Sequence, residues 1–155
     1  MRIDLSRLAP LGLDGKKEGQ WIVTGWVLAG LMAAIEFSNQ YTDALARLYL
    51  YGGSIKLIPG AVMTEFSLLV MGCEFGFVLL GLALGLLAVY HYSYHSQGSK
   101  PVYLMRRLPK PWELHIRCLG MPLAGIAGGL ALLGLECVLF YCVYRSCTPV
   151  QCLPG

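Results

Sequence analysis

The sequence predicts an all-α integral membrane protein with three transmembrane helices, an N-terminus in the cytoplasm and a C-terminus outside. Hydrophobic residues make up 56% of the 155 residues and charged residues 14%, against roughly 25% charged in soluble domains. Three stretches are apolar over about 20 residues or more, the length that crosses a bilayer. Disorder is excluded, because a disordered chain needs low hydrophobicity and high net charge, and the net charge is only +3.

The first segment, 1–19, is expected to be a cytoplasmic amphipathic leader. Ile3, Leu5 and Leu8 alternate with polar and basic residues such as Arg2 and Arg7. Basic and apolar residues mixed directly before a span are typical of a helix that lies in the membrane interface. A disordered leader is the alternative.

The three transmembrane helices are expected at 20–41, 62–90 and 119–144. No signal-peptide pattern precedes the first of them, so it is interpreted as a retained span. The segment 42–61 is expected to form an extracellular loop, and the segment 145–155 an extracellular tail.

The orientation follows from the distribution of lysine and arginine, which accumulate on the cytoplasmic side of membrane proteins. Nine basic residues lie on the side of the leader and of the 91–118 loop: Arg2, Arg7, Lys16, Lys17, Lys100, Arg106, Arg107, Lys110 and Arg117. Three lie on the other side: Arg47, Lys56 and Arg145. This bias predicts that the leader and the 91–118 loop are cytoplasmic.

The cytoplasmic basic loop, 91–118, is expected to carry short amphipathic helices. Between Pro101 and Pro109 the chain has room for about two helical turns, and Pro111 followed by Trp112 and Glu113 is typical of a helix start. Apolar anchors beside charges favour docking on a partner protein. The expected docking residues are Tyr103, Leu104, Met105, Arg106, Arg107, Leu108, Trp112 and Glu113. The alternative is a solvated loop that binds anionic lipid headgroups.

Three glutamates, Glu36, Glu74 and Glu136, interrupt the apolar spans. A carboxylate at bilayer depth is costly and usually faces protein or water. Helical rise places Glu74 and Glu136 at similar depth, roughly 13 Å from the outer ends of their spans. They are expected to contact a cationic substrate, to pair with a basic residue of a partner, or to stay protonated.

Small residues four apart predict close helix contacts. Three such pairs occur: Gly72 and Gly76, Gly81 and Gly85, Gly125 and Gly129. Three glycine faces on a three-span chain indicate that it packs against more than itself.

Cys147 and Cys152 lie in the tail that is expected on the oxidising side, where disulfides persist. Pro149 between them favours a turn, so a disulfide and a pair of free thiols are both open. His91 and His95 lie four apart, a spacing that could hold a metal, but tyrosines alternate with them as in an interfacial aromatic belt. No metal site is expected.

Three features of the chain carry a resemblance to a known family: the leader, the span order and the block Gly98-Ser-Lys-Pro-Val-Tyr-Leu-Met-Arg-Arg-Leu-Pro-Lys-Pro-Trp-Glu-Leu-His115. With these features the chain resembles small membrane proteins encoded beside ABC transporter genes in gut Firmicutes. The layout is also similar to the first half of an ABC-2 type exporter permease. This resemblance implies that 103–108 is a coupling element that docks on an ATPase. A full permease has more spans than the three expected here.

The function predicted from these features is that of a small transmembrane subunit of an ABC exporter in the bacterial cytoplasmic membrane. Its partners would be an ABC ATPase, which would bind ATP and magnesium, and a larger permease; no cofactor, catalysis or nucleic-acid binding is expected of this chain. The resemblance implies peptides or drugs as substrates. One alternative is an oligomeric channel or cation transporter that uses Glu74 and Glu136. The other is a membrane regulator or immunity protein without a transport path.

Overall fold

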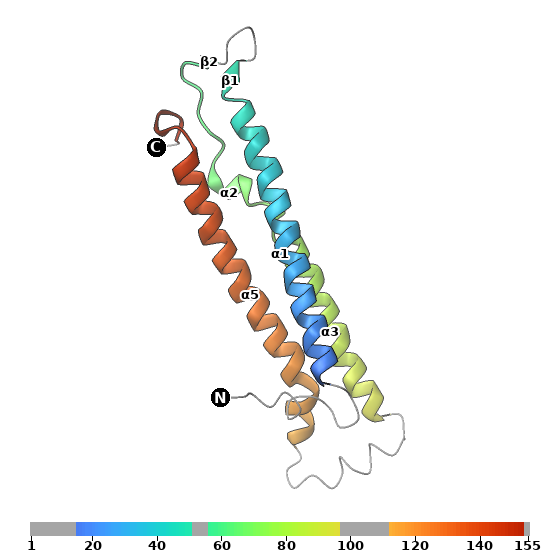
Figure 1. Cartoon of the computed structure of the whole chain (residues 1–155). Helices are drawn as coiled ribbons and strands as arrows, with labels where there is room; N and C mark the ends of the chain where they lie inside the picture. The colour runs from blue at the N-terminus through green and yellow to red at the C-terminus, as the bar shows by residue number, and fades with distance from the viewer. Residues whose placement is uncertain (1–14, 51–55, 97–111, 154–155) are drawn as a thin grey trace.

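Three long helices packed side by side dominate the computed structural model, which describes residues 15–50, 56–96 and 112–153 (Figure 1). They are α1 (Gly15–Ala46), α3 (Phe75–Ser96) and α5 (Glu113–Cys147). Each is long and apolar enough to cross a membrane, which confirms the prediction of three such helices. We call the end where α3 stops and α5 begins the base (15–20, 88–96 and 112–122). The opposite end, the cap, comprises 38–50, 56–74 and 141–153.

Helix α1 extends beyond the first expected span at both ends. It begins at Gly15, inside the segment interpreted as the leader, and ends at Ala46 instead of residue 41. Glu18 lies in its first turn, where the helix dipole favours a carboxylate. The rest of the leader, 1–14, lies outside the described residues.

The second span is shorter than expected because the chain turns at Gly72. Instead of one helix over 62–90, the structure has a one-turn helix, α2 (Phe66–Leu69), and then α3. Gly72 has a φ of 97°, a left-handed conformation that glycine adopts readily and that ends a helix. The Gly72 N–H donates to Glu74 Oε2 at 3.0 Å. Glu74 therefore lies in the turn before α3 and not inside the span.

Helix α5 begins at Glu113 with Trp112 at its N-cap position, as the Pro111-Trp112-Glu113 pattern predicts. It then runs through the third expected span to Cys147. Since α3 continues to Ser96, the loop between the two helices is shorter than the expected 91–118.

The cap is a small packed unit rather than a loop and a tail. Strands β1 (Tyr49–Leu50) and β2 (Lys56–Leu57) pair antiparallel, and a 3-10 turn, Val150–Cys152, follows α5. The backbone oxygen of Cys152, at the end of this turn, accepts a hydrogen bond from the Met63 N–H at 2.7 Å. The rings of Phe37 and Phe140 stack below it with centroids 4.3 Å apart.

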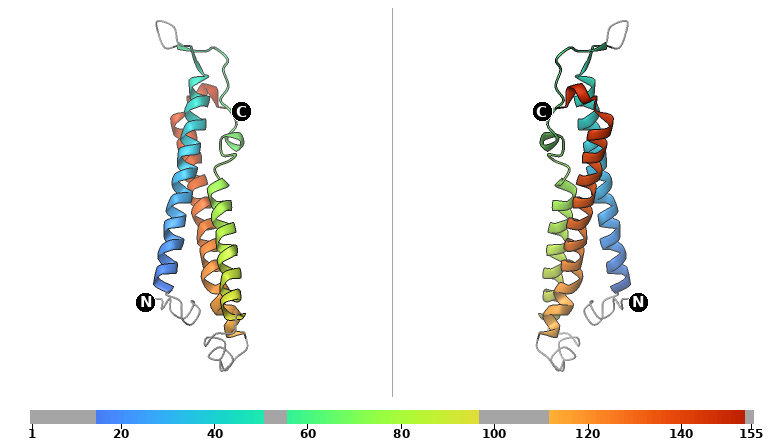
Figure 2. Two further views of the ribbon diagram at one scale, coloured as in Figure 1. Left: turned by 90° about the vertical axis from the view of Figure 1, so that its right-hand side faces the viewer. Right: turned by 90° about the vertical axis from the view of Figure 1, so that its left-hand side faces the viewer.

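The middle of the bundle is held together by close contacts at glycines. A Cβ atom added at Gly76 would lie 3.1 Å from the Cα atom of Ala29, so α1 and α3 nearly touch there. Trp26 of α1 fits against Gly128 of α5, and its Nε1 donates to the Gly125 oxygen at 2.9 Å. The side views show α1, α3 and α5 running alongside one another, with α3 beginning well short of the cap end of α1 (Figure 2).

Candidate functional site

A proline inside α5 leaves one backbone carbonyl without its helical donor. Pro122 has no N–H, so the oxygen of Cys118, four residues earlier, lacks the usual intrahelical bond. The imidazole of His91 on α3 fills this gap, with Nδ1 3.0 Å from the Cys118 oxygen. His91 and Pro122 are both fully buried. His91 thereby joins α3 to α5 at the base.

The other nitrogen of the same ring reaches α1. His91 Nε2 lies 3.0 Å from Oε1 of Glu18, whose side chain is 14% exposed. A carbonyl oxygen only accepts, so Nδ1 carries a hydrogen and donates it to Cys118. The bond between Nε2 and Oε1 then needs one further proton, carried by the imidazole or by the carboxyl group. The Glu18–His91–Cys118 contact therefore ties three helices together and holds one proton between two ionisable groups.

A second polar contact joins α3 and α5 at the base. The hydroxyl of Tyr92 lies 2.7 Å from Nδ1 of His115, nearer to solvent than the Glu18–His91–Cys118 contact. The two contacts fix the helix ends that flank residues 97–111. The expected docking residues 103–108 lie outside the described part of the chain. Trp112 is exposed at the start of α5.

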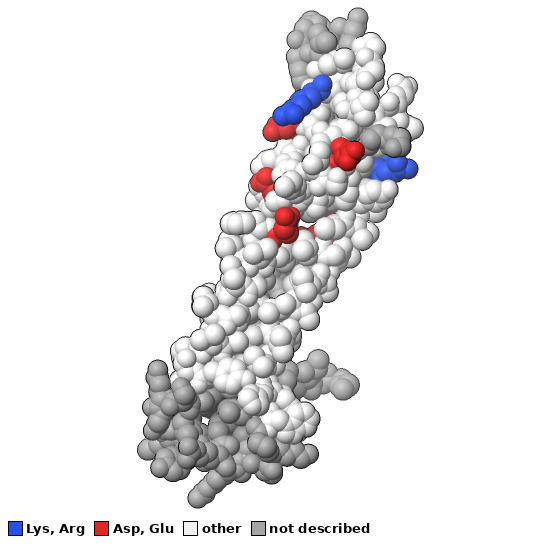
Figure 3. Space-filling model, turned by 180° about the vertical axis from the view of Figure 1, so that it is seen from behind, with Lys and Arg blue, Asp and Glu red and all other residues white. Residues whose placement is uncertain are grey.

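The three glutamates expected inside the membrane converge at the border between the helices and the cap. Burial and the nearby carboxylates of Glu36, Glu74 and Glu136 raise the pKa of the Cys73 thiol, so all three glutamates lie in its neighbourhood. Gln40 Nε2 donates to Glu36 Oε1 and to the Met71 oxygen, both at 2.9 Å. On the face shown in Figure 3, acidic side chains lie in the half of the described surface toward the cap.

Glu136 differs from the other two glutamates because its carboxylate is turned into the bundle. Its Oε1 lies against Gly30 of α1, where a Cβ atom would collide with it. Its Oε2 is buried without a hydrogen-bond partner among the described residues. A buried polar atom left in this state costs about 1–3 kcal/mol, so Glu136 is a position where a ligand or partner would be stabilising.

An apolar belt separates the base contact from the glutamates. The belt comprises 19–35, 75–90 and 119–135, and it holds no Asp, Glu, Lys, Arg or His. Glu36 lies eighteen positions after Glu18, and Glu136 lies eighteen positions after Cys118. At 1.5 Å per residue both intervals are about 27 Å, close to the roughly 30 Å of a hydrocarbon core.

The six glycines expected in helix contacts have different surroundings. Gly76, Gly125 and Gly129 pack against side chains or backbone of other helices. Gly72 instead forms the turn before α3. Gly81 and Gly85 have no atom of another described residue near the position of a Cβ atom, so nothing in the described chain covers them. Three further close contacts, at Gly25, Gly30 and Gly128, were not expected from the spacing.

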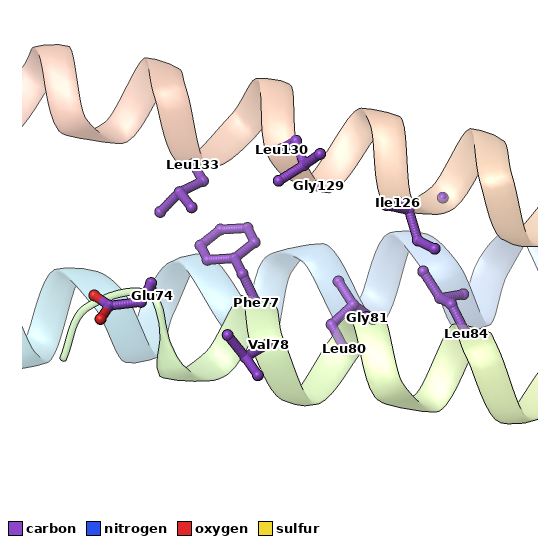
Figure 4. A pocket seen from close by; sticks show the side chains of 11 residues that line it. Glu74, Phe77, Val78, Leu80, Gly81, Leu84, Ile126, Gly129, Leu130 and Leu133 are labelled. Atoms are coloured by element: carbon purple, nitrogen blue, oxygen red, sulfur yellow. The ribbon is translucent and has the colours of Figure 1, made fainter.

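A hollow lies between α3 and α5 beside Glu74, and the residues that line it are mostly apolar. It has a volume of about 180 Å³ and is lined by Phe77, Leu80, Leu84, Ile126 and Leu133, among other apolar residues, with Glu74 at one end. The Glu74 carboxylate points away from the other side chains that line it (Figure 4). Within the described residues this hollow is therefore apolar.

Cys147 and Cys152 are not bridged in the structure. Cys147 is exposed at the last residue of α5, whereas Cys152 is 2% exposed in the core of the cap. The turn that begins at Pro149 folds Cys152 inward, which explains why the two sulfurs do not meet. No group of three or more metal-ligating side chains occurs in the described residues.

Comparisons with protein-family models, with curated proteins and with solved structures find no match for this chain.

Proposed function

We propose that this multi-pass membrane protein is a small transmembrane subunit of an ABC exporter in a bacterial cytoplasmic membrane. The base and the residues 97–111 lie in the cytoplasm, and the expected docking residues among them, 103–108, dock on a separate ATPase, which binds ATP and magnesium. The cap lies outside, and a larger permease completes the pathway for peptides or drugs.

The position in the membrane is supported by the apolar belt. Its length of about 27 Å matches the hydrocarbon core, with the Glu18–His91–Cys118 contact at one border and the glutamates at the other. The nine basic residues on the base side against three on the cap side favour a cytoplasmic base.

The observation that carries the coupling role is the Glu18–His91–Cys118 contact. It connects α1, α3 and α5 about one and a half helical turns from Ser96 and from Glu113, the residues that flank 97–111. A force that a partner exerts on residues 97–111 would reach Ser96 and Glu113, and from there all three helices as one body. A subunit that responds to an ATPase needs such a connection, whereas a lipid-binding loop does not.

The self-contained channel is the weaker alternative. Glu74 accepts a hydrogen bond from its own turn, and Glu36 binds Gln40. The hollow beside Glu74 is apolar. The carboxylates thus lie around one border of the belt instead of along a path through it.

The test is purification of the tagged full chain from its host in mild detergent, followed by mass spectrometry. We expect an ABC ATPase to remain bound, and to be lost when Arg106→Glu and Arg107→Glu are combined. The matched control combines Lys100→Glu with Lys110→Glu, which reverses the same number of charges in the same loop. The control should retain the ATPase. A homo-oligomer that carries no ATPase would contradict the proposal.

A further inference from the structure

Two neighbouring hollows lie along α1 and α5, one toward the base and one toward the glutamates, and we call them together the α1–α5 groove. The hollows have volumes of about 820 Å³ and 420 Å³, and both are lined by Val23 and Trp26. The first extends to Lys16 at the base, and the second ends at Glu136. The residues that line the two hollows thus range from the base to the Glu136 end of the apolar belt.

The walls of this α1–α5 groove have the character of a helix-packing surface. The α1 side of the groove includes two small residues, Gly30 and Ala34. Small residues in a membrane helix allow another helix to come close. Val27 and Leu31 are each 55% exposed along it. No described residue fills the groove.

The end of the groove contains a feature that specifies a partner. Glu136 lines the groove, and its buried Oε2 has no hydrogen-bond partner in the described chain. Ionisable side chains at bilayer depth pair with one another, so a basic side chain that arrives together with an apolar surface would stabilise this carboxylate.

We propose that the α1–α5 groove receives a transmembrane helix of a different membrane protein, which places a lysine or arginine beside Glu136. In the exporter proposed above this helix belongs to the permease, and only that assignment depends on the proposed function. The helix packs on Gly30 and Ala34 through its own small residues.

The length of the groove favours a helix over a lipid. One phospholipid reaches only to the middle of the bilayer, whereas the distance from Glu18 to Glu36 along α1, about 27 Å, corresponds to a full crossing. Lys16 at the base end is compatible with either occupant.

A second copy of this chain does not supply the required charge. Residues 18–46, 75–96 and 118–144 contain no lysine or arginine. The next basic residue on α5, Arg145, lies nine positions beyond Glu136, about 13 Å along the helix. A parallel copy would therefore leave the carboxylate without an ion pair.

The test is photo-crosslinking in native membranes with benzoylphenylalanine at Val27 or Leu31 of the full chain. Leu82, which is 63% exposed on α3, is the matched control position. We expect a protein adduct from the groove positions and little from Leu82. The adduct peptide should belong to a transmembrane segment that carries a lysine or arginine.

The role of the charge is tested with Glu136→Gln, which is nearly isosteric. This change should lower the yield of the crosslinked adduct at Val27 about tenfold. That is about the loss of affinity expected when one interhelical polar contact is removed. The matched change Glu74→Gln should leave the adduct unchanged, and purified Glu136→Gln chain should unfold at the wild-type temperature or above. Glu136→Lys should abolish the adduct, and a lysine-to-glutamate or arginine-to-glutamate change in the partner should restore it.

Several results would overturn the inference: adducts with lipid alone, with a second copy, or with residues 1–14 of the same chain, or a stronger adduct from Leu82 than from Val27. If the ATPase co-purifies but the groove gives no partner adduct, the exporter function stands and this inference fails. If the groove crosslinks to a basic transmembrane helix outside any ABC exporter, the inference stands and the proposed function fails.

Discussion

His91 supplies to the α5 backbone the hydrogen bond that Pro122 withholds. The oxygen of Cys118 would be left without a donor by the proline, and a buried imidazole would be costly without partners. Each residue removes the penalty of the other, although they lie on different helices. The pair therefore specifies how α3 and α5 align at the base.

The first prediction concerns the removal of this donor. His91→Ala leaves the Cys118 oxygen and the Glu18 carboxyl group without a partner, and each buried unsatisfied group costs about 1–3 kcal/mol. We expect the free energy of unfolding to fall by about 2–4 kcal/mol. Thermal unfolding of the purified chain in mild detergent measures the loss.

A double-mutant cycle separates this contact from general damage to packing. Pro122→Ala restores an N–H that can bond to the Cys118 oxygen within α5. In that background His91→Ala should cost less than in the wild type, by about 1 kcal/mol or more. If the two changes are additive, the proline and the histidine do not act through the same carbonyl.

The proton held between Glu18 and His91 leads to a second prediction. A glutamine amide at position 18 can donate to a neutral Nε2, so Glu18→Gln should keep the hydrogen bond and nearly all the stability. Glu18→Ala leaves Nε2 without a partner and should cost about 1–3 kcal/mol. Exposed Glu65 provides the matched comparison, where both changes should be close to neutral. Equal losses for Gln and Ala at position 18 would refute this account.

A third prediction contrasts two glycines of α3. A Cβ atom at position 76 meets the backbone of Ala29, which cannot move aside as a side chain can. Gly76→Ala should therefore destabilise the chain by about 1–3 kcal/mol. Gly85→Ala meets open space and should be neutral or stabilise the helix by up to about 1 kcal/mol. Unfolding temperatures of the two variants, measured side by side, test the contrast.

The sequence is sufficient to predict the three helices because each has a long apolar stretch that no soluble domain would expose. Their ends are harder to predict. The segment 62–70 is mostly apolar and continues directly into the apolar stretch of α3, yet the left-handed turn at Gly72 separates it from α3 and places it in the cap. A glycine four residues before another glycine looks the same in sequence whether it packs a helix or ends one.

The base contact was missed for a related reason. The alternation of His91 with tyrosines predicts an interfacial aromatic belt, and the position of Glu18 before the first span assigns it to the leader. Both assignments treat each helix by itself, whereas the contact exists only when three helices meet. Pro122 was the available signal, because a proline inside a span requires a donor for the carbonyl four residues earlier.

A fourth prediction distinguishes the subunit from a cation channel. The purified chain in liposomes should conduct no more sodium or potassium than empty liposomes, because the hollow at Glu74 is apolar. Glu74→Gln should leave assembly with the partners intact, since the amide oxygen still accepts the Gly72 N–H. A cation flux that falls in Glu74→Gln would favour the channel instead.

The last prediction tests the orientation through one thiol. Cys147 is exposed and unbridged, while Cys73 and Cys152 are buried. In a Cys142→Ser background, a membrane-impermeant maleimide added to intact cells should label Cys147, because the proposed topology places the cap outside. Adding Cys147→Ser should abolish the label. Labelling only after the membrane is permeabilised would place the cap in the cytoplasm and invert the topology. Labelling only after reduction would show that Cys147 is oxidised in the cell, which the free thiol of the structure does not predict.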